Sequence, residues 1–84
     1  MGKATIIKVD GTLQELDRRP TMEEARRIVG GYIELVKVGN KKTLVVNEEG
    51  LLQHLPMNVE ATKYYPYSPI VGDVILLEGW QTPG

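Results

Sequence analysis

The most constraining feature of this sequence is the stretch at residues 28–50, IVGGYIELVKVGNKKTLVVNEEG, where three local signals follow one another. Gly30-Gly31 is typical of a helix end, because glycine readily adopts the left-handed backbone conformation that terminates helices. Two runs rich in β-branched and apolar residues follow at 32–38 and 43–47, with Gly39-Asn40 between them. The stretch therefore predicts a helix end, a strand, a tight turn, a second strand and a final turn.

The helix that ends at these glycines has a clear start signal at Thr21-Met22-Glu23-Glu24. In this capping box the Thr21 hydroxyl accepts from the backbone N–H of Glu24, and the Glu24 carboxylate accepts from the N–H of Thr21. Apolar residues then recur at helical spacing and give the segment one apolar face. These residues are Met22, Ala25, Ile28 and Val29. We therefore expect a short helix over 22–29 that packs on a sheet.

Further strands are predicted near both ends of the chain. Residues 4–9 and 12–17 flank Asp10-Gly11, a dipeptide that strongly favours a β-hairpin turn. Residues 74–78, VILLE, form a last apolar strand. Residues 51–56 fit either a short strand or an extended segment, so this part of the chain stays open.

The elements together predict one α+β domain over residues 1–84. We expect an antiparallel or mixed sheet of about five strands, with the helix at 22–29 on one face and a second short helix at 59–64 at an edge. Apolar residues on both faces of the strand at 32–38 predict a central strand covered on both sides. Its second apolar face predicts a homodimer. Residues 79–84 are expected to form a short tail.

Composition excludes several function classes. The chain has no cysteine and one histidine, which excludes disulfides and thiolate metal sites and disfavours a histidine metal site. Ten lysines and arginines stand against eleven acidic residues, so the basic excess typical of nucleic-acid binders is missing. No apolar run approaches the ~18 residues of a membrane span, and no secretory signal follows Met1. We expect a cytoplasmic protein with no catalytic residues, no metal and no cofactor.

The strongest candidate binding site is the aromatic loop at residues 64–69, YYPYSP. It holds Tyr64, Tyr65 and Tyr67, and three rings so close together cannot all enter a small core. At least one ring should be exposed or cover a cleft. Tyrosine is favoured at protein interfaces, where an apolar ring with a hydrogen-bonding hydroxyl is useful, and it can also stack on a nucleotide base. The alternative is that the rings simply cap the open end of a sheet.

Three polar residues near this loop are weaker candidates. Asn58 and Thr62 flank the start of the predicted second helix, where Asn58 suits the N-cap position. Alternatively, both side chains orient an anion against free N–H groups of that helix. His54 lies among leucines before Pro56 and is expected to be a packed or surface imidazole rather than a base, since Ser68 is the only serine.

Charged residues give two further candidates. A basic cluster surrounds the first helix and forms either an anion or partner patch or a solvated face paired with Glu23 and Glu24. Its members are Arg18, Arg19, Arg26 and Arg27. The acidic pair in the turn at 47–50 is expected to be solvated, with Asn47 forming an Asx-turn rather than a metal or acid–base site.

Four blocks of the sequence also carry a family likeness. They are IVGGYIE (28–34), LVVNEEG (44–50), LPMNVEAT (55–62) and PIVGDVILLEG (69–79). In this order they resemble a family of small proteins, commonly encoded by phages and mobile elements, known as domain-of-unknown-function family 3846. That family has no assigned chemistry, so it supplies no catalytic residues. The resemblance implies a phage or prophage setting in the host cytoplasm and a role in the contest between phage and host.

Three functional hypotheses follow. The first is a non-enzymatic phage-type accessory protein with a host-takeover or anti-defence role. It binds a host protein through the loop from Tyr64 to Tyr67 and the neighbouring sheet edge. The second is a small-molecule binder that sequesters a nucleotide-type signal with helix N-terminal amides, arginines and a tyrosine stack. The third is an enzyme, and it ranks last because no acid–base group is convincingly placed.

Overall fold

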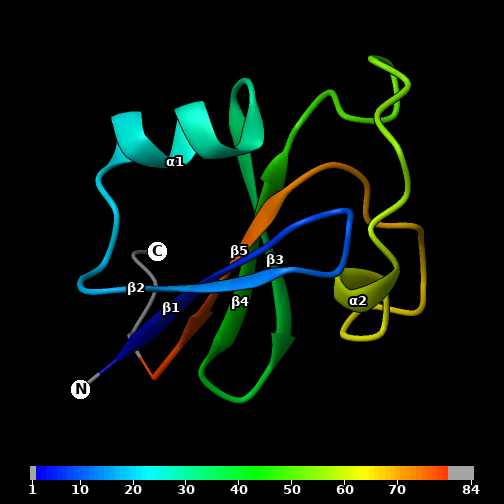
Figure 1. Ribbon diagram of the computed structural model, residues 1–84. Coiled ribbons are helices and arrows are strands. Elements are labelled where there is room, and N and C mark those ends of the chain that lie inside the picture. The colour runs from blue at the N-terminus through cyan, green and yellow to red at the C-terminus, as the bar shows by residue number, and fades with distance from the viewer. Residues whose placement is uncertain (1, 80–84) are drawn as a thin grey trace.

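The computed structural model describes residues 2–79, which form a five-stranded sheet and two helices (Figure 1). In chain order the elements are β1 (Lys3–Ile7), β2 (Leu13–Leu16), α1 (Met22–Val29), β3 (Ile33–Gly39), β4 (Lys42–Asn47), α2 (Val59–Thr62) and β5 (Val74–Glu78). The strands lie in the order β2-β1-β5-β4-β3, and every neighbouring pair is antiparallel. The predicted α+β fold with about five strands is confirmed.

Both faces of the sheet are covered, and this explains why β4 and β5 are continuously apolar. Successive side chains of a strand point to opposite faces. On one face a core forms under α1 from Ala4, Ala25, Val29, Val45, Ile75 and Leu77. On the other face a second core forms under α2 and the chain around it, from Ile7, Leu44, Val46, Ala61, Ile70, Val74 and Leu76. Figure 1 shows the two helices well apart, with α1 at the upper left and α2 at the lower right.

Helix α1 forms as its capping signals predict. The Thr21 hydroxyl accepts from the N–H of Glu24 at 3.1 Å, and a Glu24 carboxylate oxygen accepts from the N–H of Thr21 at 2.8 Å. Gly30 ends the helix in the left-handed region, with φ of 84°, and its N–H donates to the carbonyl of Arg26. The predicted bounds 22–29 are confirmed.

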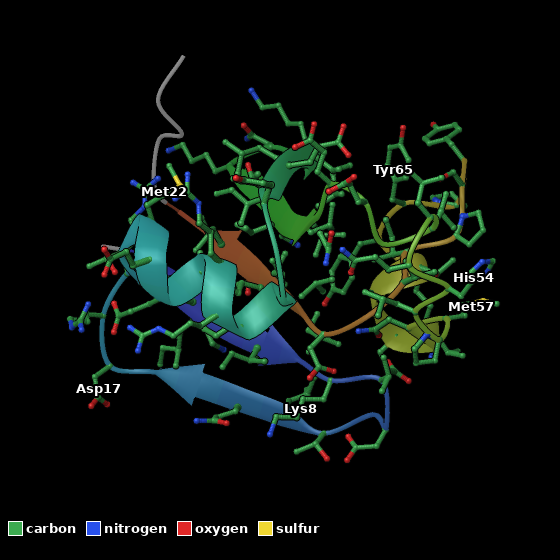
Figure 2. All side chains as sticks on the ribbon, turned by 90° about the horizontal axis from the view of Figure 1, so that it is seen from above. Lys8, Asp17, Met22, His54, Met57 and Tyr65 are labelled. Carbon is green, nitrogen blue, oxygen red and sulfur yellow. The ribbon has the colours of Figure 1, made fainter. Side chains whose placement is uncertain are left out.

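The apolar face of α1 is buried only in part. Ala25 and Val29 are buried and Ile28 packs at the margin of the core. Met22 is exposed, although the helical spacing predicted it on the same face. It lies in the first turn, where the helix meets a shallow apolar groove next to Leu35 of β3. Figure 2 shows Met22 at this outer end of α1.

Strand β3 is an edge strand, so the prediction of a central strand is wrong. It pairs with β4, and no strand of the described residues lies on its other side. The prediction failed because both faces of β3 do contact core residues. Val36 and Val38 pack against one core and Ile33 packs against the other. Leu35 nevertheless remains 46% exposed at the open edge.

The N-terminal hairpin forms, but its strands are shorter than the predicted 4–9 and 12–17. The N–H of Lys8 donates to the carbonyl of Thr12 at 2.9 Å, which closes a loop of three residues rather than two. Gly11 takes the last loop position with φ of 90°, the left-handed conformation that three-residue hairpins need there. Val9 therefore lies in the loop, where its N–H donates to the Asp73 carboxylate at 3.0 Å.

The connection between β4 and β5 is mostly turns. Residues 51–54 form turns rather than the strand or extended segment that the sequence left open. Helix α2 is confirmed but ends at Thr62, two residues before its predicted end. An isolated bridge between Met57 and Val71 joins the two arms of this connection. The last strand, β5, has the predicted bounds, and the predicted tail lies outside the described residues except for Gly79.

Candidate functional site

Asn58 holds the long connection between β4 and β5 against the sheet. Its side chain is fully buried, and its Oδ1 accepts from the N–H of Ala61 at 3.0 Å. Its Nδ2 donates to the carbonyl of Ile7 at 2.8 Å and to the carbonyl of Gly72 at 2.9 Å. The N-cap prediction for Asn58 is confirmed, and the same side chain also links β1, α2 and the loop before β5.

Thr62 closes the same loop from the other end of α2. Its hydroxyl donates to the carbonyl of Asn58 at 2.8 Å and accepts from the N–H of Ile70 at 3.0 Å. The N–H of Asn58 in turn donates to the carbonyl of Ile70 at 2.7 Å. Asn58 and Thr62 thus direct their polar atoms into the protein, where they fix the loop at 63–69 rather than present an anion site.

The loop that these residues hold forms one wall of a cleft of about 470 Å³. Strands β3 and β4 supply its floor through Val36 and Val46. Leu51 and Leu52 lie on one side, and the segment from Ser68 to Val71 lies on another. The cleft is on the face of the sheet opposite α1, because Val36 and Val46 belong to the core under α2.

Tyr65 is the tyrosine that lines this cleft. Its ring packs partly against the core and meets the ring of Tyr67 edge to face, with centroids 5.2 Å apart and planes at 67°. Tyr67 is 84% exposed, and Tyr64 is also exposed but does not line the cleft. The predicted aromatic loop therefore brings Tyr65 and Tyr67 together, with Tyr65 in the cleft wall and Tyr67 outside the cleft lining against the Tyr65 ring. Figure 2 shows Tyr65 on the side of the molecule away from Met22.

The charged residues that line the cleft are Glu34 and Glu48. Glu34 pairs across β3 and β4 with Val46, and Glu48 lies two residues beyond Val46, so the two carboxylates are diagonal neighbours on one face. Neither carboxylate makes an ion pair or hydrogen bond with any residue in 2–79. Two like charges without a counter-ion give this part of the cleft a negative potential that favours a cationic ligand.

Sequence reasoning missed Glu34 and treated Glu48 as a solvated turn residue. One signal was present: Glu34 is a charged residue on the otherwise apolar Val36–Val38 face of its strand. Asn47 in the adjoining turn behaves as predicted, because its Oδ1 accepts from the N–H of Glu49 at 2.8 Å in an Asx-turn. Its Nδ2 donates to the carbonyl of Val29, which ties the turn to the end of α1.

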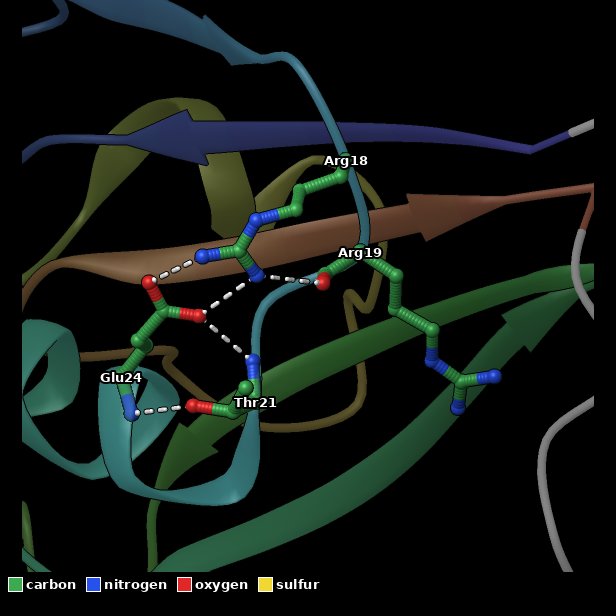
Figure 3. Close-up of polar contacts among 4 residues, drawn as sticks. All are labelled: Arg18, Arg19, Thr21 and Glu24. Carbon is green, nitrogen blue, oxygen red and sulfur yellow. Dashed lines mark hydrogen bonds and ion pairs between the residues drawn. The ribbon is translucent and has the colours of Figure 1, made fainter.

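The arginine cluster does not reach the cleft. Arg18 forms a two-pronged ion pair with Glu24, with both N–O distances at 2.8 Å (Figure 3). The hydrogen bonds from Arg18 and from the backbone of Thr21 lower the pKa of Glu24 to about 2. The guanidinium carbon of Arg26 lies 5.5 Å from the centre of the Tyr32 ring. Arg26 belongs to α1, which packs on the face of the sheet opposite the core that Tyr65 contacts.

Arg27 lies with Arg26 and Glu23 on the exposed surface of α1. The structure therefore separates Arg26 and Arg27 from the tyrosine loop, and the Asn58 side chain caps α2 by accepting from the N–H of Ala61. The three components of the nucleotide hypothesis do not meet at one place in the described residues.

His54 is an exposed residue of the turn before Pro56, with a left-handed φ of 55°. Ser68 lines the cleft but His54 does not, so the cleft holds no serine–histidine pair. Figure 2 shows His54 and Met57 at the outer surface beside α2. Among residues 2–79 no three side chains of the histidine, cysteine and acidic types lie together as a metal site.

Comparisons with known proteins place the chain in a family without naming an activity. Within residues 2–79, neither helix is long and apolar enough to cross a membrane. No curated protein and no solved structure matches the chain. The model of the family described as Domain of unknown function (DUF3846) matches residues 2–82, and the chain therefore belongs to this family.

Proposed function

We propose that this protein is a non-enzymatic binding protein whose cleft takes a segment of a partner protein that carries a basic side chain. The observation that carries the proposal is the pairing of an aromatic wall with two uncompensated carboxylates. Tyr65 supplies the wall, and Glu34 and Glu48 supply the charge. An arginine or lysine is attracted to both features, because aromatic faces and carboxylates each favour a cation.

The shape of the cleft supports the same ligand. Its floor is aliphatic, with Val36 and Val46 from the sheet. The aliphatic stem of a lysine or arginine can lie along such a floor while its charged head reaches the carboxylates. Tyr67, at 84% exposure, contacts the ring of Tyr65 in the cleft wall. It offers a rigid amphipathic ring, the kind of side chain that is enriched at protein interfaces.

The setting of the proposal is the one that the family likeness implies. A phage-type accessory protein in the host cytoplasm would meet a host protein there, and capture of that protein would serve host takeover or anti-defence. A nucleotide-type signal is the alternative ligand, supported by the exposed ring of Tyr67 as a stacking platform. The charge of the cleft favours the basic segment, since phosphates would face two carboxylates.

A peptide titration tests the proposal. A fluorescent peptide with arginine and lysine among apolar residues is titrated with the protein, and a matched peptide carries glutamate at the basic positions. We expect binding of the basic peptide only, with an affinity that falls as salt is raised. The double change Glu34→Gln and Glu48→Gln should weaken binding by roughly two- to fivefold per charge.

The matched control is Glu60→Gln, which removes a carboxylate that pairs with Lys63 outside the cleft. It should leave peptide affinity unchanged. A parallel thermal-shift panel of cyclic nucleotides and ADP-ribose derivatives distinguishes the alternative. Stabilisation by a nucleotide, with no binding of the basic peptide, would refute the proposed ligand. Catalytic turnover by the purified protein would refute the non-enzymatic assignment.

A further inference from the structure

The outer edge of β3 carries unpaired backbone groups, and we propose that it pairs with β3 of a second copy of this chain. The pairing is antiparallel and centred on Leu35, so that the two sheets become one. This inference is independent of the proposed ligand, because it rests on the backbone of β3 and on the exposure of Leu35.

The hydrogen bonding of β3 shows which backbone groups face outward. Along a strand, successive residues direct their N–H and C=O groups to opposite sides. The N–H of Glu48 donates to the carbonyl of Tyr32 at 2.9 Å, and so the even-numbered residues of this strand bond to β4. The odd-numbered residues Ile33, Leu35 and Lys37 therefore direct their N–H and C=O groups away from β4.

The other edge of the sheet is less suited to pairing. β2 has four residues and β3 has seven, and the middle of β2 carries Glu15 in an ion pair with Lys3. Charges and short length are common ways to protect a sheet edge. The β3 edge also carries charges, at Glu34 and Lys37, but Leu35 between them is 46% exposed and lines the same groove as exposed Met22. Pairing at β3 would cover apolar surface as well as backbone groups.

Symmetry and charge select the register. Residues opposite each other in a sheet direct their side chains to the same face, and successive residues of one strand alternate between faces. The two-fold axis of a β3–β3 pair must therefore pass beside a residue that lies opposite its own copy. A centre at Glu34 or at Lys37 sets two like charges opposite each other, which is unfavourable. A centre at Val36 sets the exposed Leu35 opposite a lysine, whereas a centre at Leu35 sets only the half-buried Ile33 opposite one. A centre at Leu35 sets leucine against leucine and joins the outward groups of both strands in about six backbone hydrogen bonds.

In this register each copy contributes a side chain beside the cleft of the other copy. A two-fold axis perpendicular to the sheet keeps both α1 helices on one face and both clefts on the other. Glu34 of the second copy then lies opposite Val36, which lines the cleft. Each cleft thereby gains a carboxylate from its neighbour, and the two clefts become adjacent sites for a partner with two basic segments.

Disulfide trapping tests the register directly, because the chain has no cysteine. In Leu35→Cys the two new thiols would be opposite each other, with Cα atoms about 5.5 Å apart, within the range of a disulfide. Mild oxidation should give a covalent dimer several-fold faster than in Leu13→Cys, the matched exposed position on β2. Equal rates for the two variants would overturn the interface, and fastest trapping in Val36→Cys would overturn the register.

Sedimentation measures the association without oxidation. The wild type should shift from monomer to dimer as concentration rises, whereas Leu35→Lys should remain monomeric because it places two like charges at the centre. Leu13→Lys is the control and should dimerise like the wild type. Melting temperatures report whether the variants fold. A wild type that sediments as a monomer up to the millimolar range would refute the proposal, whatever the peptide titration shows.

Discussion

Arg18 and Glu24 join the strand-to-helix connection to the first turn of α1 through two N–O contacts of 2.8 Å each. The same carboxylate accepts from the N–H of Thr21, so one side chain both caps the helix and holds the segment that leads into it. This contact links β2 to α1 across residues 17–21, and α1 in turn covers one face of the sheet.

The Glu24 carboxylate, shared by Arg18 and Thr21, makes the stability of the domain decrease at acidic pH. Hydrogen bonds from Arg18 and Thr21 lower the pKa of Glu24 from its ordinary 4.5 to about 2. A carboxyl with a lowered pKa in the folded state stabilises it fully above pH 4.5, and this contribution is lost as the pH falls towards 2. We expect the difference in melting temperature between wild type and Glu24→Gln to shrink over this window.

Thermal melts at half-unit steps of pH measure this difference. Glu23→Gln is the control, because Glu23 lies in the same helical turn outside the contact with Arg18. Its melting temperature should follow that of the wild type throughout. A gap between wild type and Glu24→Gln that stays constant from neutral pH to pH 2 would show that the contact does not hold in solution.

Asn58 should be the most costly polar residue to replace. In Asn58→Ala the carbonyls of Ile7 and Gly72 and the N–H of Ala61 lose their partner in the interior. A lost N-cap and buried groups left without hydrogen bonds together predict a loss of roughly 2–4 kcal/mol in the free energy of unfolding. Urea denaturation measures it, with Asn40→Ala at the exposed β3–β4 turn as control. Equal losses in the two variants would contradict this role.

Local sequence signals predicted where helices and strands begin and end better than they predicted which elements lie side by side in the fold. The capping box at Thr21 and Glu24 fixes where α1 begins, and Gly30 fixes where it ends, because both act through adjacent backbone groups. The place of β3 in the sheet depends on pairing between distant segments. Its apolar residues, Val36 among them, look the same in a central strand as in an edge strand with both faces in contact.

The cleft was predictable only in part. An aromatic loop that cannot bury all its rings follows from sequence, and Tyr65 does line the cleft, with the Tyr67 ring against it. The contribution of Glu34 required the pairing of β3 with β4 and the folding of the connection back over the sheet. The interior bonds of Asn58 to β1 likewise join residues 51 positions apart, which no local pattern encodes.

Gly50 should resist replacement for a steric reason. A Cβ at this position would lie 2.7 Å from Cγ2 of Val71, which lines the cleft. Gly50→Ala should therefore displace the cleft wall and cost about 1–3 kcal/mol, as overpacking of a filled site does. Gly39→Ala is the control. A Cβ at Gly39 would lie 3.8 Å from its nearest neighbour, Cδ of the flexible Lys42 side chain. Chemical denaturation should separate the variants, and equal stability would contradict the close approach.

Tyr67 should separate binding from folding. Its ring is 84% exposed, so Tyr67→Ala should change the melting temperature little. If the ring borders the bound segment, its removal should weaken binding of the basic peptide by roughly five- to thirtyfold, the range for an interface aromatic worth about 1–2 kcal/mol. Tyr64→Ala is the control, because Tyr64 is also exposed, whereas Tyr67 is the tyrosine whose ring meets that of the cleft residue Tyr65. Equal affinity of the Tyr67→Ala and Tyr64→Ala variants would place the partner elsewhere on the surface.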